Sequence, residues 1–239
     1  DLNHINGLKA RQPELVFNLV DAVRGDGSLA PVIPSLLDAV GLRYTGAHSD
    51  AWLSTLSKVG TKQTLARAAL PTPAWSARGE DLDAGQTYIV KPDIEHGSLG
   101  LDESSVVAAK DVAEVIAAKS RRFATPHFAE AFIDGREFNL ALLERRGRPN
   151  LLPIAEIVFE NWRDGSPRIV GYDAKWAPES EAYVGTPRRF GLERAEPALA
   201  AKLEKLATRA WELFDLSGYA RVDFRVNARG EPFILEINV

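Results

Sequence analysis

The sequence predicts an α+β protein whose sheets are largely antiparallel, preceded by a partial parallel α/β layer. Three strand-like runs follow one another between residues 127 and 159 without a helix between them, and two more close the chain. Short connections of this kind join antiparallel strands, because parallel strands need a long crossover. Only the first 46 residues show a β–loop–α–β order, which favours a parallel pair there.

Composition and charge narrow the function classes. The 239 residues are 45% hydrophobic and 26% charged, as expected of one large or two modest globular domains. The net charge of -4 gives no overall attraction for nucleic acid or an anionic membrane. Cysteine is absent, which excludes disulfides, thiolate metal sites and a cysteine nucleophile. No apolar run approaches the roughly 20 residues of a membrane span and no signal-peptide pattern opens the chain, so we expect a cytoplasmic protein.

Both ends of the chain suggest a piece of a longer protein. Methionine is absent, the initiator included. The sequence begins at Asp1 without a strand and stops at Val239, directly after an apolar strand-like run. We therefore expect native segments beyond both ends.

The N-terminal part predicts the parallel layer and two helices. Residues 15–19 form a continuous apolar run, typical of a buried parallel strand, and 43–46 read as a second short strand. Between them, 29–40 has helical apolar spacing. A further helix is expected over 51–69, ended by the prolines that follow it. Lys58 and Lys62 lie on one face of this helix, since they are four residues apart.

The middle of the chain predicts strands around a single helix. The elements expected there are a strand at 87–91, a polar loop at 93–100, a helix at 112–119, and strands at 127–133, 137–143 and 151–159. Asp134-Gly135, between two of these strands, is a dipeptide typical of a hairpin turn.

The last third predicts a long loop, a helix and a hairpin. Residues 173–189 are polar, rich in Pro and Gly, and too irregular for a regular element. An amphipathic helix is expected at 198–215, with Pro197 suited to its first turn. Strands at 219–226 and 232–238 then form a hairpin around a four-residue loop.

The closing hairpin brings polar side chains to one face. Strand alternation and a loop at 227–230 make four of them converge, namely Arg221, Asp223, Glu236 and Asn238. In that register Arg221 pairs directly with Glu236, and the opposite face offers Leu235 and Ile237 to a core.

Three of these side chains form a candidate metal site. Asp223, Glu236 and Asn238 offer two carboxylates and an amide oxygen, which suit Mg²⁺, with Mn²⁺ as the alternative ion. Without a cation the carboxylates repel by about 3 kcal/mol at ~5 Å and an effective dielectric near 20. A solvated hairpin face, with Arg221 paired to Glu236, is the alternative. The polar interruption of the buried run Phe-Ile-Leu-Glu-Ile-Asn favours the metal site.

These residues resemble the closing signature of the ATP-grasp ligases, and further segments are similar to D-alanine–D-alanine ligases in the same order. The signature is Gly218-Tyr219-Ala220-Arg221-Val222-Asp223-Phe224 followed by Leu235-Glu236-Ile237-Asn238. The other matching segments are Phe17-Asn18-Leu19, Tyr44-Thr45-Gly46, Lys58 with Thr61-Lys62, Leu70-Pro71-Thr72-Pro73, Ile89-Val90-Lys91-Pro92 with Glu95 and Gly97-Ser98, the run from Glu130 to Glu137, Pro153 to Ile157, and Tyr172-Asp173 with Lys175-Trp176. Each motif alone is weak, but the ordered set is specific.

The resemblance implies the ATP-grasp fold, in which two α+β subdomains hold ATP between them. It implies an ATP- and magnesium-dependent ligase of class EC 6.3 that joins a carboxylate, activated as an acyl phosphate, to an amine. Amino acids or peptides are the implied substrates, with no nucleic acid or membrane partner, and a homodimer is left open. The implied domains are a partial pre-grasp domain at 1–57, subdomain A at 58–128 and subdomain B at 129–239, with a truncated C-terminus.

Roles for individual residues follow from the same resemblance. Those implied for ATP are phosphate contacts from Lys58, Lys91 and Lys175, a phosphate-covering loop containing Ser98, an adenine acceptor at Glu130, backbone contacts at Ile133, a ribose acceptor at Glu137, and purine packing by Leu101 and Leu235. Arg221 is implied to stabilise the tetrahedral oxyanion. Taken singly, Lys58 and Lys175 also fit solvated surface positions, whereas Lys91 is the exception because it ends an apolar strand before Pro92. Glu130 also fits a salt bridge in a hairpin.

Three positions depart from the dipeptide ligase pattern. Asp21 stands for a histidine, Gly97 for the first serine of a Ser-Ser pair, and Trp176 for a tyrosine. In the resembled family these positions lie around the first D-alanine, so the departures imply a different substrate pair. Two alternatives stay open: a non-catalytic ATP-binding ATP-grasp module, and an ATP-grasp enzyme of another branch, such as an amino-acid–peptide ligase or a carboxylase-type subunit.

Overall fold

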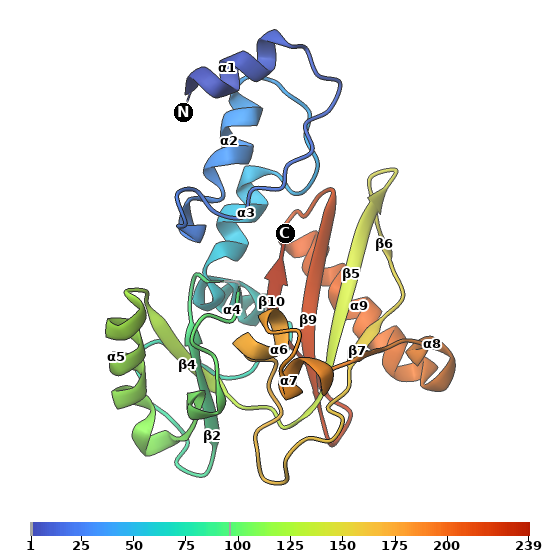
Figure 1. Ribbon diagram of the computed structural model, residues 1–239. Helices are drawn as coiled ribbons and strands as arrows, with labels where there is room; N and C mark the ends of the chain where they lie inside the picture. Colours follow the sequence, from blue (N-terminus) through green and yellow to red (C-terminus); the bar gives the residue numbers. More distant parts are fainter. Residues whose placement is uncertain (1, 96) are drawn as a thin grey trace.

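The computed structural model describes residues 2–95 and 97–239, which form two antiparallel sheets (Figure 1). In this part of the chain, one sheet has the order β1-β4-β2-β3, from β1 (Trp75–Ser76), β2 (Thr87–Pro92), β3 (Val106–Ala108) and β4 (His127–Ala131). The other has the order β10-β9-β5-β7-β8, with β6 paired to β5, from β5 (Gly135–Arg145), β6 (Arg148–Leu151), β7 (Ala155–Ile157), β8 (Arg188–Arg189), β9 (Tyr219–Asn227) and β10 (Pro232–Asn238). The predicted α+β class is confirmed.

The described helices cover these sheets and form an N-terminal lobe. They are α1 (Leu2–Ala10), α2 (Val32–Ala39), α3 (Ser49–Leu56), α4 (Lys58–Arg67), α5 (Val112–Phe123), α6 (Tyr172–Trp176), α7 (Glu181–Val184), α8 (Leu192–Ala195) and α9 (Pro197–Leu213), with 3-10 turns at Gly27–Leu29, Glu103–Ser105 and Ala109–Asp111. None of the helices in the described ranges is long and apolar enough to cross a membrane.

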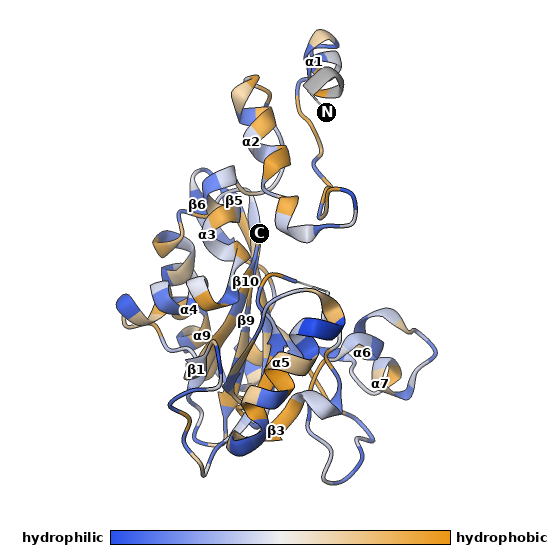
Figure 2. Cartoon of the chain, turned by 90° about the vertical axis from the view of Figure 1, so that its left-hand side faces the viewer, coloured by the Kyte–Doolittle hydropathy of each residue, from blue (hydrophilic) through white to orange (hydrophobic). Residues whose placement is uncertain are grey.

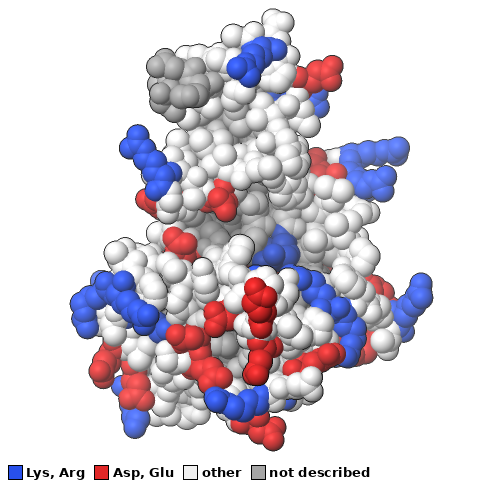
Figure 3. Space-filling model, in the orientation of Figure 1, with Lys and Arg blue, Asp and Glu red and all other residues white. Residues whose placement is uncertain are grey.

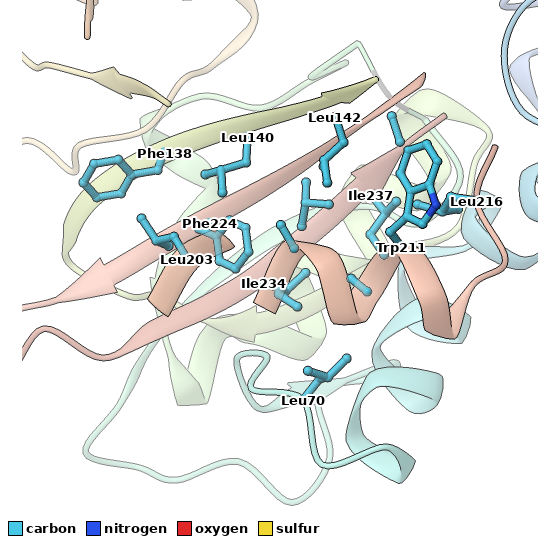
Figure 4. Packing of buried hydrophobic residues seen from close by; sticks show 14 of the residues in the cluster. Leu70, Phe138, Leu140, Leu142, Leu203, Trp211, Leu216, Phe224, Ile234 and Ile237 are labelled. Atoms are coloured by element: carbon cyan, nitrogen blue, oxygen red, sulfur yellow. The ribbon is translucent and has the colours of Figure 1, made fainter. Parts of the chain in front are cut away.

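The main core lies between α9 and the second sheet. Leu203 on α9 is fully buried with Phe138 of β5 and Phe224 of β9 (Figure 4). Burial of each such side chain stabilises the fold by about 1.5–3 kcal/mol. A smaller core joins α5 to the first sheet, through Ile116 and Val90. The two cores hold the two sheets as separate layers on either side of a cavity.

The helix predicted over 51–69 is two helices. The chain leaves the helical conformation at Ser57, whose side chain accepts from the Gly60 backbone N–H and so caps α4. The single-helix prediction is therefore wrong at this break. Lys58 and Lys62 still share a face, and both are buried.

The predicted hairpin at Asp134-Gly135 is wrong. β4 and β5 belong to different sheets, and residues 132–134 cross from one to the other. A Cβ at Gly135 would lie 2.0 Å from the Val226 carbonyl oxygen, so glycine serves a close approach to β9 rather than a turn. Because β4 lies wholly in the first sheet, we propose moving the boundary between subdomains from residue 128 to residues 132–134.

The apolar run at 15–19 is not a buried strand. Its one described ladder contact is a parallel bridge from Val16 to Tyr44, which matches the predicted direction. Phe17 and Leu19 are 69% and 74% exposed, and the run shows as an orange trace below α1 in Figure 2. A parallel strand is buried only when other elements cover both of its faces, and the described residues cover little of either face of this run.

Two smaller predictions need correction. The strand expected at 151–159 is divided, since β6 and β7 flank Pro153, which has no N–H for a ladder. The segment 173–189 is not wholly irregular, because it holds most of α6, all of α7 and β8. Ser180 caps α7 by accepting from the Tyr183 backbone N–H. The strand at 87–91 and the helices at 112–119 and 198–215 match β2, α5 and α9 to within a few residues.

Candidate functional site

A cavity of about 720 Å³ lies between the two sheets. All twelve residues proposed for binding, metal coordination or catalysis line it, namely Lys58, Lys91, Ser98, Glu130, Ile133, Glu137, Lys175, Arg221, Asp223, Leu235, Glu236 and Asn238. Leu101 lines it as well. Basic side chains show in the central hollow of the molecule in Figure 3, and both acidic and basic side chains show on the front face below it.

The hairpin of β9 and β10 reaches this cavity in a register that differs from the predicted one. Glu236 pairs with Asp223 and Asn238 with Arg221, whereas we expected Arg221 opposite Glu236. A β-bulge between Ile234 and Glu236 causes the shift. The bulge also exchanges the faces of two side chains relative to the expected alternation. Ile234 is buried in the core, and Leu235 lines the cavity. The four polar side chains converge nonetheless.

Asp223 is the most buried of these four polar side chains. Its Oδ1 accepts from Arg221 at 2.7 Å and from Asn139 Nδ2 at 2.8 Å, and Asn238 Nδ2 lies 3.2 Å from Oδ2. Burial raises the pKa of Asp223 to about 6, against the Arg221 charge that lowers it, and Glu236 raises it further. Asp223 in turn raises the pKa of Arg221. The carboxylate therefore lies where an additional cation would favour its ionised form.

Lys58 stands between the hairpin and the loop after β2. It is 4% exposed at the start of α4, and its Nζ donates to the Glu95 carbonyl oxygen at 2.5 Å. Glu236 Oε2 lies 3.7 Å from the same Nζ. Burial lowers the pKa of Lys58, because the charged form is desolvated.

Glu130, which also lines the cavity, lies between two lysines. Its Oε1 is 2.5 Å from Lys91 Nζ, and its Oε2 is 2.5 Å from Lys62 Nζ. Burial raises the pKa of Glu130, but the two ammonium groups outweigh burial and hold it below the usual range. Burial opposes the charge of Lys91 too, and the pKa of Lys91 is nevertheless raised, by Glu130 and Glu236. The cluster is thus ionised although it is almost fully buried.

Two loops meet over the cavity. Ser98 has a positive φ of 58° and donates through Oγ to the Val170 carbonyl oxygen at 3.3 Å. Trp176 Nε1 donates to the Gly97 carbonyl oxygen at 2.9 Å. Two of the departures from the dipeptide ligase pattern, Gly97 and Trp176, are therefore in direct contact. Asp21, the third, is exposed and is not among the residues that line the cavity.

Three residues of the site received no role from the sequence. Lys62 bonds Glu130, Asn139 bonds Asp223, and Arg225 pairs with Glu137 at 2.7 Å. Arg225 lies on the same face of β9 as Asp223 by strand alternation, and Asn139 lies on the same face of β5 as Glu137, so the period of two could have found both. Lys62 was marked only by its place four residues after Lys58.

Comparison with known proteins identifies the family. Residues 79–239 match the family model described as D-ala D-ala ligase C-terminus. The D-alanine–D-alanine ligase of Moorella thermoacetica is 31% identical, over 100% of this chain and 76% of its own length. That of Bordetella avium is 27% identical, over 99% of this chain and 71% of its own length. The chain belongs to the D-alanine–D-alanine ligase family.

The fold agrees with that family. The crystal structure of the Bacillus anthracis D-alanine–D-alanine ligase complexed with ATP superposes with a TM-score of 0.70 at 20% identity, over 100% of this chain and 72% of that chain. The predicted ATP-grasp fold is confirmed, with the two sheets as its two halves. By family, this chain is an ATP-dependent ligase that joins a carboxylate to an amine.

Proposed function

We propose that this D-alanine–D-alanine ligase relative joins amino acids or peptides and acts on a pair other than two D-alanines. One observation supports the site: twelve side chains from segments as far apart as α4 and β10 line a single cavity. Chance surface charges would not gather there, since ionisable groups are rarely buried unless they are paired or bind something.

Cations on three elements give the cavity its affinity for a polyphosphate. Lys58 begins α4, Lys91 is on β2 and Lys175 is on α6, and all three line the cavity. Each ammonium is a compact charge that suits a phosphate oxygen. Ser98 lies in the loop proposed to cover the phosphates, where its positive φ lets the backbone turn towards them.

The hairpin offers the ligands for a hard cation. Asp223 and Glu236 pair directly across β9 and β10, and Asn238 is bonded to Asp223 through its amide nitrogen, which leaves the amide oxygen as the group for a metal. No group of three His, Cys, Asp or Glu able to hold a metal occurs in the described part of the chain. The proposed site therefore uses two carboxylates and one amide oxygen, and the phosphates of ATP would supply further ligands to the ion. This set fits Mg²⁺, which would neutralise phosphate charge, and Mn²⁺ is the alternative.

The proposed ligase reaction depends on positioning the reactants and stabilising negative charge rather than on a general base. A substrate carboxylate would attack the γ-phosphate of ATP to give an acyl phosphate and ADP, and the amine would then displace phosphate. Arg221, which pairs with Asp223 and lines the cavity, would stabilise the oxyanion that forms in the second step. Glu130 and Glu137 would accept from adenine and ribose, and Ile133 and Leu235 would flank the base.

The substrate proposal rests on the three departures. Trp176 fills its position with an indole that donates to the Gly97 backbone, so neither residue supplies a side-chain hydroxyl. Asp21 brings a carboxyl where a histidine is the rule in the family. The missing hydroxyls at Trp176, which lines the cavity, and at Gly97 beside it support a different donor, whereas Asp21 lies outside the cavity lining.

The test is ADP release by the full-length protein with Mg²⁺ and ATP, across a panel of amino acids and small peptides that includes D-alanine. We expect turnover that needs one particular carboxylate and one amine and is fastest with a pair other than two D-alanines. Arg221→Ala and Glu236→Gln should abolish it. If two D-alanines give the highest kcat/KM, the substrate proposal is wrong, although the ligase assignment stands.

Two further outcomes bear on the site itself. ATP binding without turnover on any pair would favour the non-catalytic ATP-binding module. ATP binding that is unchanged by Glu236→Gln and by Lys91→Met would contradict the proposed roles of those residues. We also propose that the enzyme acts in the cytoplasm, where ATP is supplied, and sedimentation velocity would distinguish a monomer from the homodimer left open above.

A further inference from the structure

Arg225 is a buried arginine beside the proposed nucleotide site. It lies on β9, directly opposite Glu137 of β5, and only 5% of it is exposed. Its guanidinium is 2.7 Å from Glu137 Oε2, and both residues line the cavity. A cation buried this deeply is costly unless it is paired, so the ion pair determines where both side chains lie.

Further contacts fix the orientation of the guanidinium. Nη1 donates to the Gly135 carbonyl oxygen at 3.1 Å, and Nη2 donates to the Arg168 carbonyl oxygen. The group also lies over the rings of Phe132 and Phe159, at 6.0 and 5.4 Å from their centroids. Arg225 therefore joins the crossing between the two sheets, the loop before α6 and Glu137.

The two carboxylate oxygens of Glu137 have different surroundings. Oε2 is held by Arg225, whereas no hydrogen bond to Oε1 occurs within residues 2–95 and 97–239. The carboxylate is 12% exposed and lines the cavity, so a ligand can reach it. Glu137 thus presents one oriented acceptor, and a planar five-donor guanidinium is the group that can hold a carboxylate in this way while also bonding two carbonyls.

We propose that Arg225 is a positioning residue for the ribose of the nucleotide, holding Glu137 so that its remaining oxygen accepts from a ribose hydroxyl. This inference rests on the proposed function, in which Glu137 binds ribose. It predicts that Arg225 determines how strongly the enzyme prefers a ribonucleotide over one that lacks the hydroxyls. A residue that only held the fold together would weaken all nucleotides alike.

The experiment compares the Kd of ATP with that of 2′,3′-dideoxy-ATP by titration calorimetry with Mg²⁺. Wild-type protein should bind ATP about tenfold or more tightly, since a hydrogen bond to a charged acceptor is lost in the analogue. Arg225→Met should bring that ratio close to one by weakening ATP, while the Kd of the analogue changes less than about twofold. Arg229→Met, at an exposed arginine of the β9–β10 turn, is the matched control and should leave the ratio unchanged.

Two further variants test whether the effect of Arg225 acts through Glu137. Arg225→Lys keeps the positive charge but loses the planar guanidinium with its several donors, so the ratio of the two Kd values should fall at least threefold. This variant tests the inference if Arg225→Met does not fold. Glu137→Gln should lower the ratio as far as Arg225→Met does. An unchanged ratio in folded Arg225→Met or Arg225→Lys overturns the inference while leaving the proposed function intact. Wild-type protein that binds neither nucleotide overturns both.

Discussion

Lys62 Nζ lies 2.5 Å from Glu130 Oε2, and both side chains are buried, at 0% and 2% exposure. The same Nζ donates to Thr72 Oγ1 at 2.8 Å, and Thr72 donates to the Ile234 carbonyl oxygen. Burial lowers the pKa of Lys62 to about 8, even though Glu130 raises it. Lys62 thus links the proposed adenine acceptor to the bulged strand β10.

Replacing Lys62 should destabilise the protein strongly. Lys62→Met leaves Glu130 with Lys91 as its remaining cation, and removing one partner of a buried ion pair typically costs about 3–5 kcal/mol. Urea unfolding would measure the loss. The matched control is Lys205→Met, at an exposed lysine of α9, which should change stability by less than about 0.5 kcal/mol. The double variant Lys62→Met with Glu130→Gln should recover part of the loss, and a single-variant loss under about 1 kcal/mol contradicts this account.

His127 should make stability fall in mild acid. It is 4% exposed, and its Nδ1 is 2.9 Å from the Thr125 carbonyl oxygen. Burial lowers the pKa of His127 below 6.5, the Lys119 charge lowers it further, and the bond to Thr125 opposes both. Below pH ~6.5 the unfolded chain therefore binds a proton that the folded state resists, so the free energy of unfolding decreases as pH falls towards the folded pKa.

The measurement is the unfolding free energy of wild type and of His127→Gln between about pH 7.5 and about pH 5. The difference between the two proteins should shrink or reverse in favour of the variant as pH falls. His48→Gln, at an exposed histidine, should follow the wild-type curve. Parallel curves for wild type and His127→Gln would show that His127 does not contribute to acid sensitivity.

Trp176 should affect substrate binding without affecting stability. Its side chain is 60% exposed and yet donates across the cavity mouth to the Gly97 carbonyl oxygen. Trp176→Phe removes that bond, worth about 1 kcal/mol, so we expect KM for ATP or for the donor substrate to rise about fivefold. The melting temperature should stay within about 2 °C. Trp162→Phe, which removes an indole bond to Pro167 within its own loop, is the matched control and should leave KM unchanged.

Much of the site could be predicted because strand alternation is a local property. Asp223 and Asn238 needed only the period of two within each strand to reach the cavity face. The register could not be predicted, because the bulge before Glu236 depends on how Ile234 packs into the core and on a backbone bond from its N–H to Pro71. Packing against a distant segment leaves no mark within the hairpin sequence.

Errors in the fold share a cause. Asp134-Gly135 has the composition of a turn, but the two strands around it pair with different partners, and partner choice is a tertiary property. Phe17 and Leu19 have the composition of a buried strand, but burial depends on which elements cover them. The long amphipathic helix α9 was predicted closely because its apolar face and Pro197 are both encoded within its own sequence.

Substitution of Gly135 tests whether this glycine, at the crossing between the sheets, is needed for a turn or for the close approach to β9. If it serves a turn, Gly135→Ala should cost about 1 kcal/mol or less, since its φ is not in the left-handed region. If it serves the approach to β9, the added Cβ meets the Val226 carbonyl oxygen and the loss should be about 3 kcal/mol or more. Urea unfolding distinguishes the two. Gly7→Ala is the matched control, because a Cβ there meets nothing within 4 Å and alanine should stabilise α1 slightly.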